Sequence, residues 1–99
     1  MFEKTARQWV HEMFQEGRLN GCDDAFLKQL TKDYARQLEE IFICEVKKNL
    51  ERIGKAGEFE RMLLYDSQYI NKYLNQTIPG YPGFQTNLFE RARKIILGS

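Results

Sequence analysis

The sequence predicts an all-α fold, a compact bundle of four to five helices with one long central helix. In every apolar segment the hydrophobic residues recur at three- and four-residue intervals, the period of a helix face. Runs that alternate with period two and are rich in β-branched residues, as strands would be, are absent. The chain has 99 residues, the length of one domain, so residues 1–99 are predicted to form a single helical domain.

The first predicted helix spans residues 1–17. Its apolar positions follow one helical face, and Gly17 is placed to end it as a C-terminal cap. We expect Trp9, Val10 and Met13 to lie in the core, packed against a later helix. The apolar positions of this segment are Phe2, Ala6, Trp9, Val10, Met13 and Phe14.

The second predicted helix, residues 23–53, is the long central one. Asp23 and Asp24 offer an N-cap and a favourable charge at its start, and no Gly or Pro interrupts it before Gly54. Some 30 helical residues extend about 45 Å, which is longer than a compact domain of this size needs. The sequence therefore predicts that this helix protrudes, bends, or is covered by a partner over part of its apolar length.

Residues 58–76 are predicted to form one or two helices, with a break near Asp66 and Ser67. The segment from Ile78 to Gly83 carries both prolines of the chain and is predicted to be a rigid turn, because proline fixes its own φ and disfavours helix before it. The last predicted helix spans residues 84–97.

Composition argues against several classes of protein. Fifteen basic and 14 acidic side chains nearly cancel, so no strong field attracts nucleic acid. No apolar run approaches the roughly 20 residues that span a bilayer, and we expect a soluble, cytoplasmic protein without membrane contact. Two cysteines are too few for a disulfide scaffold. Cys44, within a helical apolar run, is predicted to be a buried thiol.

No residue pattern specifies catalysis, a metal or a cofactor. His11 is the only histidine and has no His or Cys at ligand spacing. Cys22 precedes a helix start, but Asp23 and Asp24 follow it and disfavour a thiolate. No glycine segment matches a phosphate-binding loop. The prediction is a non-enzymatic protein.

Two surface features are candidates for binding. Tyr65, Tyr69 and Tyr73 recur at i, i+4 spacing, and tyrosine is enriched at protein interfaces; the alternative is that they pack at the rim of this domain's own core. Arg91, Arg93 and Lys94 form the densest basic cluster, although cations near a helix C-terminus also complement the helix dipole without any ligand.

These features favour a protein–protein interaction module that binds a protein partner or a second copy of itself. One alternative is a small regulatory or inhibitory protein, for example a phage-encoded one, that covers a partner's surface. Another is a helical nucleic-acid binder with a turn at residues 54–57. Glu58 and Glu60 argue against the latter, because they would stand where a reading helix approaches phosphates.

From about Asp24 to Leu97 the layout resembles a family of small helical domains of unknown function from uncultivated bacterial lineages. The shared points are a long helix, a glycine break at residues 54–57, a short helix, and the turn Ile78-Pro79-Gly80-Tyr81 into a last helix. Because the function of that family is itself unknown, the resemblance implies a fold and no site.

Overall fold

The computed structural model describes residues 2–98 and contains only helices over that range. The predicted all-α fold with one long helix is confirmed. Residue 1 of the predicted first helix lies outside the described residues. The elements in chain order are α1 (Glu3–Gln15), α2 (Asp24–Glu51), α3 (Ala56–Tyr65), the 3-10 turn η1 (Ser67–Tyr69), α4 (Ile70–Thr77) and α5 (Tyr81–Leu97).

The ends of the first two helices have the caps that the sequence predicts. Gly17 follows α1 with a φ of 82°, and the amides of Gly17 and Arg18 donate to the carbonyls of Phe14 and Met13, which is a Schellman cap. At the start of α2 the Asp23 carboxylate accepts the amide of Phe26 at 2.8 Å. Both caps satisfy backbone groups that a helix end leaves without a partner.

The prediction of a rigid turn over Ile78–Gly83 is wrong in its second half, because α5 begins at Tyr81, earlier than the predicted residue 84. Pro82 lies in the first turn of α5, where its missing N–H and fixed φ are compatible with a helix. The turn itself is made by Gly80, which has a φ of 67° in the left-handed region.

The predicted segment 58–76 is two helices with a 3-10 turn between them. Asp66 leaves the helical conformation with φ −136° and ψ 40°, and the chain turns through residues 67–69 before α4 begins. The break is near Asp66 and Ser67, as expected, but neither side chain caps the following helix.

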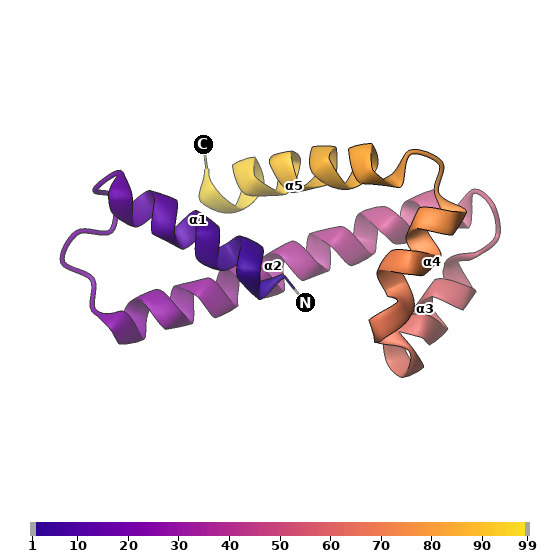
Figure 1. Cartoon of the computed structure of the whole chain (residues 1–99), viewed down its shortest axis with the longest axis horizontal. Helices are drawn as coiled ribbons and strands as arrows, with labels where there is room; N and C mark the ends of the chain where they lie inside the picture. Colours follow the sequence, from indigo (N-terminus) through magenta and orange to yellow (C-terminus); the bar gives the residue numbers. More distant parts are fainter. Residues whose placement is uncertain (1, 99) are drawn as a thin grey trace.

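The long helix α2 is the axis of the molecule (Figure 1). It has 28 residues and extends about 42 Å at 1.5 Å per residue. Helix α1 packs against its first half in the opposite direction, α5 packs along its second half, and the α3–α4 hairpin packs at its C-terminal end. The molecule measures 48 × 25 × 17 Å, so α2 sets its length.

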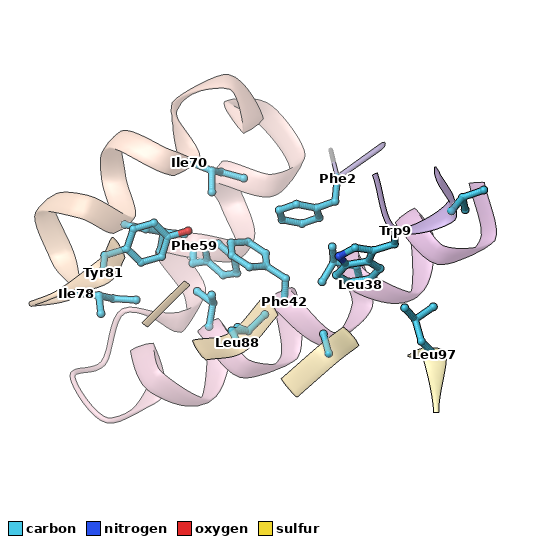
Figure 2. Packing of buried hydrophobic residues seen from close by; sticks show 14 of the residues in the cluster. Phe2, Trp9, Leu38, Phe42, Phe59, Ile70, Ile78, Tyr81, Leu88 and Leu97 are labelled. Atoms are coloured by element: carbon cyan, nitrogen blue, oxygen red, sulfur yellow. The ribbon is translucent and has the colours of Figure 1, made fainter. Parts of the chain in front are cut away.

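One continuous apolar core joins these parts (Figure 2). Trp9 of α1 lies over Leu38 of α2, and Phe59, Ile78 and Tyr81 pack together at the other end. Phe2 closes the place where α1 and α5 meet on α2: its ring contacts Phe42 edge-on at 4.9 Å and Phe89 at 5.3 Å between centroids.

The structure bears on two sequence expectations about α2, of which the burial of Cys44 is wrong. The buried stripe Leu38, Phe42, Val46 and Leu50 is fully covered by the chain's own helices, because α1 and α5 divide the length of α2 between them. A partner is therefore not needed to cover these four residues, whereas Phe26 and Ile53, at the two ends of the predicted apolar length, are 50% and 54% exposed. Cys44, predicted to be buried, is an exposed free thiol because it lies two positions after Phe42, on the opposite side of the helix from the stripe.

Trp9→Ala is expected to lower the free energy of unfolding by about 3–5 kcal/mol, because Trp9 is buried against α2 and truncation leaves a cavity. Urea unfolding followed by far-ultraviolet circular dichroism measures this. Ile95→Ala, at an exposed position of α5, is the matched control and should change stability by less than about 0.5 kcal/mol. Equal stability of the Trp9 variant and wild type would contradict the described packing.

Tyr81→Phe is expected to keep or raise stability at neutral pH. The Tyr81 hydroxyl is buried and no described protein group hydrogen-bonds to it, and a buried unpaired hydroxyl costs about 1–3 kcal/mol. A clear loss of stability in the variant would contradict this.

Tyr81 also predicts a pH dependence. Burial raises the pKa of Tyr81 to about 12, whereas in the unfolded chain it titrates near about 10. The raised pKa contributes stability below about pH 10 that is lost as pH rises to about 12. Between about pH 10 and pH 12 the free energy of unfolding, measured with urea, should fall by about 2–3 kcal/mol less in Tyr81→Phe than in wild type. Identical pH profiles would contradict this.

Candidate functional site

The tip of the α3–α4 hairpin exposes three large apolar side chains. Leu64 is 75% exposed, Tyr65 79% and Tyr69 54%, and the three fall within six consecutive positions. The hairpin projects from the end of α2 with this tip pointing away from α5 (Figure 1). We call Leu64, Tyr65 and Tyr69 the hairpin tip.

The backbone of the turn holds the hairpin tip in place. The amide of Asp66 donates to the Met62 carbonyl, and the amide of Tyr69 donates to the Asp66 carbonyl, both at 2.9 Å. Beneath the turn, Phe59 and Ile70 are buried in the core. The tip is therefore the end of a hairpin in which Leu64, Tyr65 and Tyr69 face solvent while the buried Phe59 and Ile70 anchor the turn.

The predicted single face of three tyrosines is wrong. Because α3 ends at Tyr65 and α4 begins at Ile70, the three residues are not successive turns of one helix. Tyr65 and Tyr69 are exposed, while Tyr73 is half-buried against the core. Burial, together with the nearby Glu58 carboxylate, raises the pKa of the Tyr73 hydroxyl. Tyr73 thus packs at the rim of the core, the alternative that the sequence left open.

The basic cluster of α5 is mostly engaged within the chain. Arg93 pairs with Glu12 of α1 at 2.6 Å, and Arg91 pairs with Glu45 of α2 at 3.7 Å. Lys94 lies in the last turn of α5 and is exposed. Two of the three cations therefore join α5 to its neighbouring helices, which leaves one available to a ligand.

His11 and Cys22, weighed separately in the sequence, line the same groove between α1 and the start of α2. Among residues 2–98 no hydrogen bond joins the two side chains, or either of them to a carboxylate. Within the same range, no three His, Cys, Asp or Glu side chains gather as a metal site would require. None of the helices described there has the length and apolar composition to span a bilayer.

Sequence reasoning missed Leu64 and the groove. The signal for Leu64 was its register: Phe59 and Leu63 point inward on α3, and the next residue lies about 100° away around the helix axis. The groove depends on how α1 and α2 approach each other, which periodicity within one segment does not describe.

The chain matches no protein-family model, no curated protein and no solved structure. The resemblance to a helical family of unknown function therefore stays a prediction. What the protein does has to be inferred from its own surfaces.

Arg93→Gln tests whether the basic cluster serves the fold. Because Arg93 and Glu12 pair across two helices, a double-mutant cycle with Glu12→Gln should give a coupling energy of about 0.5–1 kcal/mol, the upper range for a partly exposed pair. Lys94→Gln, the control, should leave stability within about 0.5 kcal/mol of wild type. Zero coupling would mean that the pair adds nothing to stability and would contradict a role of the basic cluster in the fold.

Proposed function

We propose that this protein is a non-enzymatic protein–protein interaction module that binds its partner through the hairpin tip. The observation that carries the proposal is the exposure of Leu64, Tyr65 and Tyr69 together at a projecting turn. Clustered exposed apolar side chains on a soluble domain are typical of contact surfaces. Tyrosine is among the residues that contribute most to binding energy, since its ring is large, rigid and amphipathic.

The hairpin tip suits a partner with a shallow apolar pocket. Beside it, a hollow of about 660 Å³ runs along α3 and includes Arg61, Tyr65 and Asp66. Its polar lining would supply the rim of a contact whose centre is apolar, the usual arrangement in protein interfaces. A partner could bury the aromatic rings at the centre and hydrogen-bond to these polar groups at the edge.

The alternatives differ in how well the surface supports them. A regulatory or inhibitory protein would use the same tip, and the activity of the captured partner would distinguish it from a neutral binding module. Nucleic-acid binding receives less support, because Arg91 and Arg93 are held in ion pairs. A cytoplasmic location, also part of this proposal, agrees with two free cysteines.

Site-specific photocrosslinking in cells tests the proposal. A benzoylphenylalanine at position 65 is expected to give a discrete crosslinked product with a protein partner. The same group at position 95, which is exposed to a similar degree (Ile95 70%) but lies on α5, is the matched control and should give none. Light scattering of the purified protein would show whether the partner is a second copy.

A second variant links the product to the hairpin tip. Leu64→Asp combined with Tyr69→Ala keeps the buried anchors of the turn, so the chain should fold with an unchanged dichroism spectrum, and the crosslink from position 65 should be lost. A crosslink from position 65 that survives these substitutions, or that is equally strong from position 95, would overturn the proposal.

A further inference from the structure

A second surface lies at the opposite end of the molecule. A groove of about 820 Å³ separates α1 from the first turns of α2 and includes part of the loop between them. Its floor is apolar and is formed by Val10, Phe14, Cys22 and Leu27. Phe14 is 46% exposed, so its ring is only partly covered by the chain's own residues.

The groove lies at the edge of the α1 face that builds the core, where Val10 is buried and Phe14 is partly exposed. Arg7, Val10 and Phe14 follow one another at three- and four-residue intervals and line the groove. Trp9 and Met13, on the neighbouring stripe, are buried in the core. Helix α1 therefore continues its apolar surface from the buried Val10 to the partly exposed Phe14, while α5 lies on its other side, where Arg93 pairs with Glu12.

The rim of this groove is cationic. Arg7, Lys28 and Lys32 line it and are exposed. Within the described chain they belong to none of the ion pairs, in contrast to Arg91 and Arg93. The acidic side chains of the groove, Glu3 and Asp24, lie in the first turns of α1 and α2, where they complement the helix dipoles. Three cations beside an apolar floor favour a ligand that is both acidic and amphipathic.

We propose that this groove binds an amphipathic helix of a protein partner, with apolar residues at i, i+3 or i+4 and i+7 on one face and glutamates or aspartates beside them. Two antiparallel helices bound the groove (Figure 1), so a third helix laid along it would extend the helix packing that covers the rest of α2. The groove spans α1 from Glu3 to Phe14, about 16 Å or three helical turns, which is long enough to hold those anchors, whose span is about 10.5 Å.

A helix fits the groove better than a small apolar anion does. Ligand pockets bury about 70–90% of a small molecule's surface, whereas this groove is open along one side and leaves Phe14 partly exposed. A helix needs only one face covered. Since the groove and the hairpin tip lie at opposite ends of α2 (Figure 1), occupation of one leaves the other accessible, and the inference does not depend on the proposed role of the tip.

Fluorescence anisotropy with two synthetic peptides of about 15 residues, long enough to form a marginal helix, tests this. Both carry leucines at the three anchor positions; one has glutamates and the other lysines beside them. Wild-type protein is expected to bind the acidic peptide about tenfold more tightly than the basic one, from opposite-charge contacts along the rim. Binding should weaken with added salt.

Charge reversal makes the test specific to the groove. Lys28→Glu combined with Lys32→Glu should reverse the preference between the two peptides, and Phe14→Ala should weaken binding of both. Lys55→Glu combined with Lys72→Glu, an equal charge change at exposed positions of the other end, is the matched control and should leave the wild-type preference. The groove variants should also retain the crosslink from position 65.

Several results would overturn the inference. One is that the acidic peptide does not bind at about 1 mM, the weak end of measurable affinity. Others are that both peptides bind equally, or that reversing the charges of Lys28 and Lys32 leaves the preference unchanged. Binding of dodecanoate in the groove without binding of the peptide would assign it to a small anionic amphiphile instead. Dimerisation that the same reversals abolish would assign it to a second copy of this chain.

Discussion

The apolar stripe of α2 is the constraint on which the rest of the structure depends. The helix extends about 42 Å, and its stripe must be removed from water by helices that are each shorter. Residues Glu3–Gln15 and Tyr81–Leu97 provide two such helices, and the last turns of α5 run beside α1, where Arg93 pairs with Glu12 (Figure 1). Phe2 fills the space between the two helices on α2 and packs edge-on against Phe42 and Phe89. The elongated shape follows: the radius of gyration is 15.3 Å, against about 13 Å for a compact domain of this size.

Covering α2 in two parts also decides where binding surfaces remain. With its length occupied, the α3–α4 hairpin can pack only at the C-terminal end, so its turn projects and exposes Tyr65 and Tyr69. At the other end, α5 covers one side of the α1–α2 pair and leaves the opposite side as a groove. Both surfaces are by-products of how unequal helices share one core.

The charged residues also fall into two groups, those that join helices by ion pairs and those that face solvent at the groove. Arg91 and Arg93 hold α5 against α2 and α1 through Glu45 and Glu12, and such pairs set the position of a helix more than they add stability, since partly exposed ion pairs contribute about 0–1 kcal/mol. Among residues 2–98, Arg7, Lys28 and Lys32 at the rim of the groove form no ion pair, so their charges are available to an incoming anionic group.

The sequence by itself determined the elements, because helical period, caps and breaks are local: the Gly17 cap, the Asp23 cap and the break near Asp66 each depend on a few neighbouring residues. It also determined that Trp9 is in the core. Only the tertiary structure decided which exposed residues stand together, because that depends on directions between helices. The turn at Asp66 separates Tyr73 from Tyr65 although their spacing is regular, and the approach of α1 to α2 creates a groove from residues of two separate helices.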